Sequence, residues 1–324
     1  MSIDGQFGFT FGAGPEEEPQ EPLAAVVIEE RPSSVPVRLD LAVNVDLFGN
    51  PIDEFKSAKE RYGVWPVTVW DCDMQDGDTR CLKELIGDNA EQRLEARATP
   101  GANSVYQNKQ GSNVSIFNPA VAAWCLNLYA PQQGVCYDPF AGGGTRAIMA
   151  AKHGLAYVGC EIREGEIGAV QERCQRAGVA ESVALLHKDS RDCGLPDEYA
   201  DYLLTCPPYY DLEQYNGGDR DLSMLPMYSM FCGAISQVIR ECYRILKPGS
   251  IACWIVGLMR DSKGGLRGLH HDIARLHVSA GFVFKEEIVL AQRNNGAIQR
   301  VGMFENGNKF LVRTHEYLLV FVRP

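Results

Sequence analysis

From about residue 134 onward, the apolar positions switch repeatedly between two patterns, continuous short runs and the spacing of an amphipathic helix. Short runs of apolar and β-branched residues are separated by amphipathic stretches, which is the pattern of βαβ units around a parallel sheet. The runs predict strands near residues 134–138, 156–161, 183–187, 201–205 and 251–256. The amphipathic stretches predict helices near residues 143–153, 164–177, 226–246 and 268–280. The sequence therefore predicts an α/β fold with a doubly wound sheet.

The last part of the chain departs from this alternation. Phe282 to Ala291 and His315 to Val322 each read as a long strand. The polar, basic segment between them, at about 292–314, is too long for a simple hairpin turn. Insertions of this kind are usually either functional or disordered.

The N-terminal third is organised differently. Residues 1–36 combine Gly, Pro and a Glu run with few periodic apolar positions, a composition that cannot offset the entropy of ordering by burial. We expect a disordered acidic tail there. Residues 37–110 contain short apolar clusters such as Val64 to Trp70, and a helix is predicted near Thr79 to Ile86. This range is expected to be an ordered extension that precedes the main domain at 111–324.

Composition favours a cytoplasmic globular protein. A chain of 324 residues with 45% hydrophobic content can bury one large core. It has no run of about 18 apolar residues that could span a membrane, and its N-terminus lacks the pattern of a secretion signal. The 11 cysteines form no Cys-x-x-Cys pair and no cluster with histidine. We therefore expect reduced thiols, with neither disulfides nor a metal site.

The net charge of −11 argues against indiscriminate phosphate binding, but the charge is unevenly spread. Residues 1–40 contain eight acids and two bases, whereas from residue 258 onward ten bases oppose six acids. Because Arg, Lys and Asn side chains reach phosphates and base edges, the basic insertion is a candidate nucleic-acid contact. Its candidate residues are Arg293, Asn294, Arg300, Lys309 and Arg313. A plain solvated loop is the alternative.

A glycine-rich loop follows the first of these strands. Asp138 stands at the carboxyl edge of the sheet, where open α/β sheets bind ligands, and Gly142 to Gly144 allow a tight turn before a helix that starts at Thr145. Glu161 ends the next strand about 20 residues later, a spacing at which an acid accepts both ribose hydroxyls. The ligand is thus expected to contain adenosine. Glycine spacing alone also fits NAD, FAD or a turn without a ligand.

A second loop ends the fourth strand. After Asp201 to Thr205 come Cys206, Pro207, Pro208 and Tyr209, and the two prolines can neither donate ladder hydrogen bonds nor enter a helix interior. A rigid loop of this kind presents backbone carbonyls beside an aromatic ring, which suits a planar base. Hydrogen bonds from an exocyclic amine to such acceptors help localise its lone pair, so that attack on a methyl group needs only close, in-line placement.

Together the two loops resemble those of the amino-methyltransferases of DNA. The family's cofactor motif, Asp-Pro-Phe-x-Gly-x-Gly-Thr, is matched throughout by residues 138–145, and its Asp/Asn/Ser-Pro-Pro-Tyr/Phe motif is matched by 206–209 except at Cys206. The resemblance covers about 111–324, and the last part looks like the methylases of phages and prophages.

This resemblance implies a class I methyltransferase, Rossmann-like fold with an antiparallel final strand. It implies S-adenosylmethionine as the cofactor and a site-specific enzyme, of the kind found in restriction-modification, in the cytoplasm of a bacterium or a phage-infected host. The reaction would be methyl transfer to an exocyclic amino group of a base flipped out of duplex DNA.

The resemblance also implies roles at matching positions. The residues expected around the cofactor are Phe117, Asp138, Phe140, Gly142, Gly144, Thr145, Glu161 and Asp189. Glu161 would hold the ribose, Asp189 would lie near the adenine amino group, and Phe117 would pack against the methionine moiety. Asp189 also fits a simple turn, and Phe117 also fits a capped helix start. Tyr209 would stack on the flipped base.

Cys206 departs from the family motif. A thiol accepts hydrogen bonds weakly, so either the neighbouring carbonyls do most of the orienting or the chemistry is altered. Its size is close to that of Ser, and the Ser-Pro-Pro members of the family act on cytosine N4, so the resemblance slightly favours cytosine N4 over adenine N6. A covalent role, as in cytosine C5 methyltransferases, is an alternative, but there the cysteine follows the proline. Two other classes stay open, namely the same fold acting on RNA or a nucleotide, and a non-catalytic nucleic-acid-binding relic.

Overall fold

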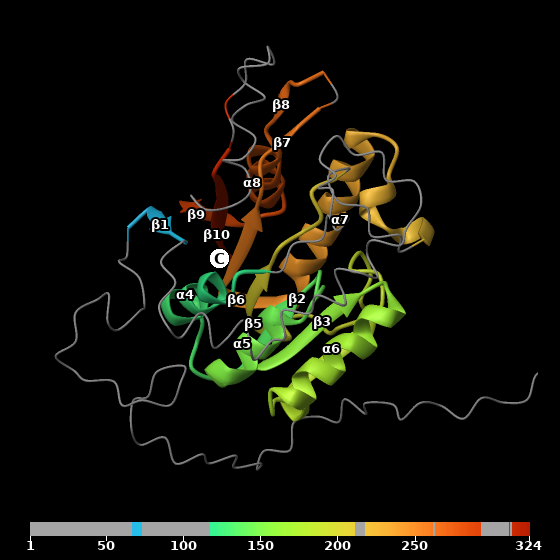
Figure 1. Cartoon of the computed structure of the whole chain (residues 1–324), viewed down its shortest axis with the longest axis vertical. Helices are drawn as coiled ribbons and strands as arrows, with labels where there is room; N and C mark the ends of the chain where they lie inside the picture. The colour runs from blue at the N-terminus through green and yellow to red at the C-terminus, as the bar shows by residue number, and fades with distance from the viewer. Residues whose placement is uncertain (1–66, 73–116, 211–217, 262, 293–310, 312) are drawn as a thin grey trace, which may run out of the picture. The chain divides into compact units, whose positions relative to one another are not determined.

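The computed structural model describes residues 67–72, 117–210, 218–261, 263–292, 311 and 313–324. In these residues, eight strands form one sheet in the order β1-β9-β10-β6-β5-β2-β3-β4, drawn in Figure 1. The strands are β1 (Val69–Asp71), β2 (Val135–Asp138), β3 (Ala156–Glu161), β4 (Val183–His187), β5 (Ala200–Thr205), β6 (Leu246–Val256), β9 (Val283–Ala291) and β10 (His315–Val322). β7 (Met259–Arg260) and β8 (Leu266–Arg267) form a separate hairpin. The α-helices of the described residues are α4 (Pro119–Tyr129), α5 (Thr145–His153), α6 (Glu164–Arg176), α7 (Tyr228–Ile245) and α8 (Leu269–Ser279).

The strand directions confirm the predicted fold class. β4, β3, β2, β5 and β6 are parallel neighbours, and β10 runs antiparallel to both β6 and β9. The final strand is therefore the reversed one. β1 pairs in parallel with β9, with Trp70 opposite Leu290, so a short piece of the range 37–110 belongs to the central sheet.

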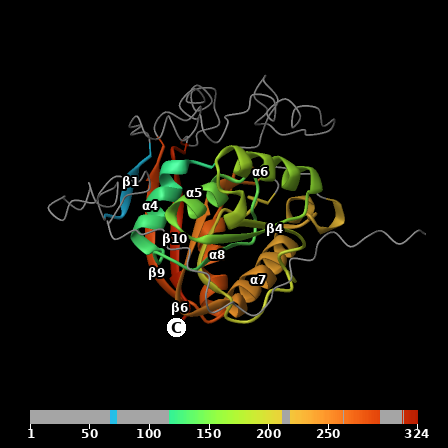
Figure 2. The ribbon, with the colours of Figure 1, turned by 90° about the horizontal axis from the view of Figure 1, so that it is seen from below.

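Side chains alternate between the two faces of the sheet, as the period of two requires. In β6, Cys253 and Ile255 pack in the same core cluster as residues of α4, α5 and α6. Ala252, Trp254 and Val256 pack with residues of α7 and α8 in the other cluster. Figure 2 shows the helices on the two sides of the sheet. A strand buried on both faces needs the near-continuous apolar run that the sequence shows.

The main difference from the predicted elements lies at β6. The strand begins at Leu246 rather than near residue 251, and α7 ends at Ile245. Pro248 cannot continue a helix, and Gly249 has a φ of 81°, so this part of the strand is irregular. The register of β6 against β5 shifts at the same place. The helix predicted near Thr79 to Ile86 lies outside the described residues.

The parallel strands deliver their last residues to one edge of the sheet. Asp138, Glu161, Thr205 and Val256 end β2, β3, β5 and β6. In open α/β sheets this is the edge at which ligands bind. Among the helices of the described residues, none is long and apolar enough to span a bilayer.

Candidate functional site

The glycine-rich loop after β2 depends on glycine at particular positions. Gly142 and Gly144 have φ angles of 50° and 82°, in the left-handed region that favours glycine. A Cβ at Gly144 would lie 2.7 Å from Val170 Cγ1. A Cβ at Gly159 would lie 2.8 Å from Ala141 Cβ, so a glycine in β3 lets the loop lie directly against that strand. Backbone and packing together fix the shape of the loop.

Asp138 is the centre of this loop. Its Oδ1 accepts hydrogen bonds from Phe140 N at 2.9 Å and Thr205 Oγ1 at 2.6 Å, and its Oδ2 accepts from Arg146 Nε at 2.7 Å and Tyr157 OH at 2.9 Å. The residue is 0% exposed. A carboxylate has about four acceptor positions, so protein donors occupy the acceptor capacity of Asp138. The side chain thus orders the loop from within and joins β2 to β3, β5 and α5.

Arg146 holds the same loop from its other side. Its Nη2 atom donates to the carbonyls of Phe140 at 2.5 Å and Ala141 at 3.3 Å. Its Cζ atom lies 4.8 Å from the ring centroid of Phe117. Burial disfavours the charged form, but the carboxylate of Asp138 outweighs this and raises the pKa of Arg146. Arg146 is therefore a permanent cation that neutralises Asp138 and braces the loop carbonyls.

Phe117 directly precedes a capped helix. Asn118 is the N-cap of α4, its side chain accepts from Ala120 N at 3.0 Å, and Pro119 is the first helical residue. The capped helix start considered for this segment is therefore present. The cap also brings the Phe117 ring onto Arg146, next to the glycine-rich loop.

Two carboxylates, Glu161 at the end of β3 and Asp189 shortly after β4, each accept hydrogen bonds from the arginine two residues later in the chain. Glu161 Oε1 accepts from the backbone N of Arg163 at 2.9 Å and from its Nε at 3.1 Å. Asp189 Oδ1 accepts from the backbone N of Arg191 at 2.9 Å, and Asp189 Oδ2 accepts from its Nη2 at 2.5 Å. Burial opposes ionisation of Asp189, but the Arg191 hydrogen bonds lower its pKa. Both carboxylates are thus held in fixed orientations by these hydrogen bonds.

Three further residues, Phe140, Thr145 and Ser190, complete the site around β2. Phe140 is partly buried, with its ring centroid 6.2 Å from that of Trp254. Thr145 is buried and begins α5, whose first amides face the loop. Ser190 Oγ donates to the carbonyl of Pro139, which ties the segment after β4 to the loop after β2.

The loop after β5 is connected to β10 through side chains. Cys206 Sγ lies 3.2 Å from Tyr209 OH, and Tyr209 OH donates to Glu316 Oε1 at 3.5 Å. Gln292 Nε2 donates to Glu316 Oε2 at 2.8 Å. Burial raises the pKa of Glu316, because a carboxylate away from water favours its neutral form. The hydroxyl of Tyr209 is thereby held between a thiol and a carboxyl group.

The ring of Tyr209 packs directly against the backbone of Gly257. A Cβ at Gly257, the residue after β6, would lie 2.5 Å from Tyr209 Cε2 and 3.0 Å from its Cδ2. Only a glycine leaves room for the ring in this position. Pro207 is buried and Pro208 is partly exposed, so the loop is anchored at one proline and open at the other.

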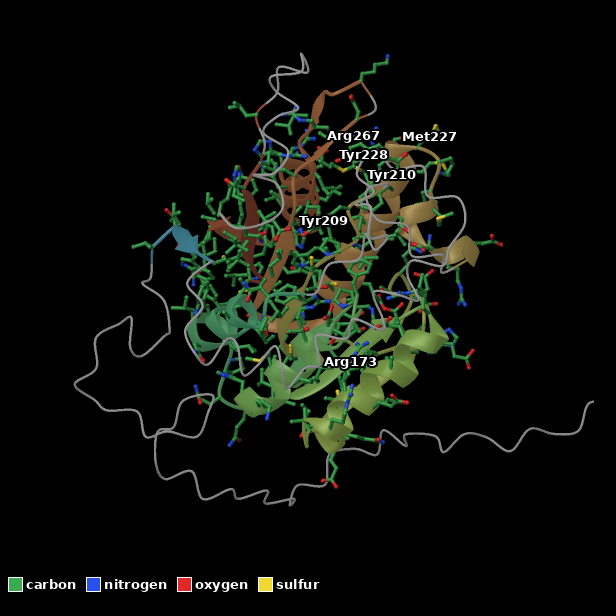
Figure 3. The ribbon with its side chains drawn as sticks, viewed as in Figure 1. Arg173, Tyr209, Tyr210, Met227, Tyr228 and Arg267 are labelled. Atoms are coloured by element: carbon green, nitrogen blue, oxygen red, sulfur yellow. The ribbon has the colours of Figure 1, made fainter. Side chains whose placement is uncertain are left out.

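Tyr210 ends this loop in an unusual backbone conformation. Its φ is 54°, which costs a residue other than glycine about 1–2 kcal/mol. Its ring packs against those of Tyr228 and Phe231, with centroids 5.5 Å away in both cases. Figure 3 shows Tyr210 beside Tyr228 and Arg267, with Tyr209 on the inner side. Burial of the aromatic ring offsets the backbone strain and keeps the loop in one shape.

The comparisons with known proteins agree on what this site belongs to. A family model for DNA methylases of the N6/N4 type matches residues 24–172 and 200–324. The chain belongs to this family. Type II methyltransferase M.MjaVI of Methanocaldococcus jannaschii is 25% identical over 112 residues, which are 35% of this chain and 55% of the relative. The chain thus matches about half the length of this curated relative.

Solved structures with a similar fold include other methyltransferases. TrmN from Thermus thermophilus is 17% identical, with a TM-score of 0.43, over 72% of this chain and 53% of that protein. Geranyl diphosphate C-methyltransferase from Streptomyces coelicolor A3(2) is 12% identical, with a TM-score of 0.45, over 63% and 80% of the two chains. The family match confirms the resemblance to DNA amino-methyltransferases and the fold expected from it.

Within this DNA methylase, the structure brings most of the predicted site residues to one edge of the sheet. The loop after β2 and the loop after β5 meet directly, because Thr205, just before the second loop, donates a hydrogen bond to Asp138, at the start of the first. Arg313 is partly buried just before β10. Arg293, Asn294, Arg300 and Lys309 lie outside the described residues. In the part of the chain that is described, no cluster of three potential metal ligands occurs and ten cysteines are free thiols.

Sequence reasoning missed several residues of the DNA methylase site. These are Arg146, Tyr157, Thr205, Gly257 and Glu316. Thr205 and Gly257 stand at the carboxyl ends of predicted strands, and that position was a usable signal. Glu316 is 107 residues from Tyr209 in sequence, and no spacing rule could have paired them.

Proposed function

We propose that this DNA methylase transfers a methyl group from S-adenosylmethionine to the N4 amino group of cytosine in duplex DNA. The observation that carries the proposal is the hydrogen bond between Thr205 and Asp138, which locks the loop with the family's cofactor motif to the loop with its catalytic motif. A methyl donor and an acceptor base held by these two loops would be placed at one sheet edge.

The residues of the first loop suit the proposed cofactor. Gly142 and Gly144 adopt the turn that lets a ligand approach the backbone, and the first amides of α5 face the same space. Glu161 and Asp189, at the ends of adjacent strands, would hold the ribose and the adenine amino group. S-adenosylmethionine supplies an electrophilic methyl group on a sulfonium centre when it is bound. Asp138 would act as a positioning residue, since its acceptors are taken by protein donors.

The second loop suits a base flipped out of the helix. Tyr209, held by Gly257 and Glu316, would stack on the base, while the loop carbonyls and Cys206 accept the protons of the amino group. These hydrogen bonds would localise the lone pair of the amine and orient its nitrogen toward the bound methyl donor, which would leave as S-adenosylhomocysteine while the amine loses one proton. The Ser-like size of Cys206 is the reason for choosing cytosine. The basic insertion at about 292–314, with Arg313 at its end, is the proposed contact to DNA.

Transfer of tritium from labelled S-adenosylmethionine tests the proposal. The full chain is incubated with duplex DNA, and the DNA is digested to nucleosides and separated. Label in N4-methylcytosine supports the proposal, and label in N6-methyladenine overturns the choice of base. Label in RNA alone refutes DNA as the substrate. Tyr209→Ala should abolish transfer and leave cofactor affinity unchanged; cofactor binding by the wild type without transfer to any nucleic acid would favour a relic.

A further inference from the structure

The β7–β8 hairpin lies against the second loop through one cation. The Cζ atom of Arg267 is 4.9 Å from the ring centroid of Tyr210 and 5.0 Å from that of Tyr228. Figure 3 shows these three side chains together, with Met227 at their outer side. Tyr210 is the direct neighbour of Tyr209. Arg267 therefore contacts the residue that follows, in sequence, the one proposed to stack on the base.

The charge of Arg267 has no counterion in the described part of the chain. No carboxylate there lies within ion-pair distance of it, and its Nη1 atom is buried without a hydrogen-bond partner. A buried donor left unpaired costs about 1–3 kcal/mol. Two tyrosine rings partly compensate through cation–π contact, which orients the guanidinium but satisfies none of its N–H donors.

Nearby acids are used elsewhere. Asp272 accepts from Tyr228 OH at 2.7 Å and also pairs with Arg275. Asp261, in the hairpin itself, accepts from the backbone N of Lys263 at 2.9 Å and of Gly265 at 2.8 Å, so its carboxylate closes the turn. With Arg260, Lys263 and Arg267 against Asp261, the hairpin is a basic element next to the catalytic motif.

We propose that Arg267 binds one backbone phosphate of the target DNA strand beside the nucleotide that enters the site. This inference rests on the proposed function. A guanidinium stacked on aromatic rings offers its planar set of N–H donors to two oxygens at once, the arrangement with which arginine binds phosphate. The phosphate would pair with guanidinium donors other than the buried Nη1 and would neutralise the charge that no described carboxylate offsets. A phosphate contact fixes where the strand lies and carries no sequence information, so Arg267 would act equally on every DNA sequence.

The salt dependence of DNA binding tests this contact. Binding of a fluorescent duplex to the full chain is measured by anisotropy over a series of salt concentrations, for wild type, Arg267→Gln, Arg267→Lys and Arg275→Gln. Each phosphate neutralised contributes about 0.9 to the slope of log K against log salt, so Arg267→Gln should lower the slope by about 0.9. Its affinity at low salt should fall about 10-fold or more, as for a lost charge-assisted hydrogen bond. Arg267→Lys should keep the slope and lose part of the affinity.

Arg275→Gln is the matched control. The Arg275 side chain is 78% exposed, pairs with Asp272 and lies on α8, so its loss should leave the slope unchanged. A wild-type slope in Arg267→Gln overturns the phosphate contact, whereas wild-type protein that binds no DNA at any salt overturns the proposed function with it. Cofactor affinity, measured by calorimetry, reports folding of each variant. Should Arg267→Gln fail to fold, Arg267→Lys decides, because unchanged affinity there contradicts two-oxygen binding by the guanidinium.

Discussion

Replacement of Gly257 by Ala should slow methyl transfer strongly while leaving the cofactor site intact. The added Cβ would lie 2.5 Å from Tyr209 Cε2, where ordinary contacts begin at 3.4 Å. The ring must therefore move by about 1 Å. Because Tyr209 is proposed to stack on the reacting base, a displacement of about 1 Å there can lower the rate about 100-fold. The ring has little room to move, since Tyr209 is 9% exposed and its hydroxyl is bonded to Glu316.

The assay separates this effect from a loss of stability. Overpacking a filled site costs about 1–3 kcal/mol, so the midpoint of thermal unfolding should fall modestly. We expect kcat for methyl transfer to DNA to fall about 100-fold, with cofactor affinity within a factor of about three of wild type. Gly233→Ala is the control, because a Cβ there meets nothing within 4 Å and helix α7 should gain about 1 kcal/mol from alanine. A Gly257→Ala enzyme with wild-type kcat would refute the account of how Tyr209 is held.

Three other predictions concern charged and titrating groups. Asp138→Asn should destabilise the protein by about 3–5 kcal/mol in urea unfolding, because Arg146 is left buried without its counterion. The double variant with Arg146→Met should recover part of that loss. If the destabilisations of the two single variants simply add in the double variant, the ion-pair account is contradicted. Because the pKa of Glu316 is raised, the folded state binds its proton more tightly than the unfolded state does. The unfolding free energy of the wild type, compared with that of Glu316→Gln, should therefore fall as pH rises from the ordinary carboxyl pKa through the raised one. Unfolding free energies of the two proteins that vary in parallel with pH would disprove this. Burial lowers the pKa of His277 to about 3, so the stability that the neutral ring contributes is complete above the ordinary histidine pKa of about 6.5 and is lost as pH falls toward 3. The variant His277→Leu should therefore lose less unfolding free energy than wild type as pH falls over this range. An equal loss in the two proteins would contradict the prediction.

The centre of the sheet was predictable because its strands are buried on both faces. β3 and β4 begin and end where the apolar runs at 156–161 and 183–187 do. Both runs are short and continuous. In β3 the residues after Ala156 are buried, so local pattern and tertiary burial demand the same element, whereas β4 at the edge of the sheet is only partly buried. β6 was harder, because Pro248 and Gly249 look like a loop but lie inside an irregular strand.

The site was predictable in its motifs and not in its contacts. Residues 138–145 and 206–209 stand out because rigid or left-handed backbone needs glycine and proline in particular places. Contacts across the sheet leave no such mark. The Asp138–Thr205 hydrogen bond joins residues 67 apart in sequence. The occupied carboxylate of Asp138 likewise follows from Tyr157 and Arg146, whose side chains turn inward only in the folded protein.

The most direct test of the central claim is the nucleoside composition of duplex DNA after incubation with the full chain and S-adenosylmethionine, measured by mass spectrometry. Wild-type protein should produce N4-methylcytosine, and the Tyr209→Ala variant, although it binds the cofactor equally well, should produce none. Unmodified DNA from a wild-type protein that is saturated with cofactor would contradict the account.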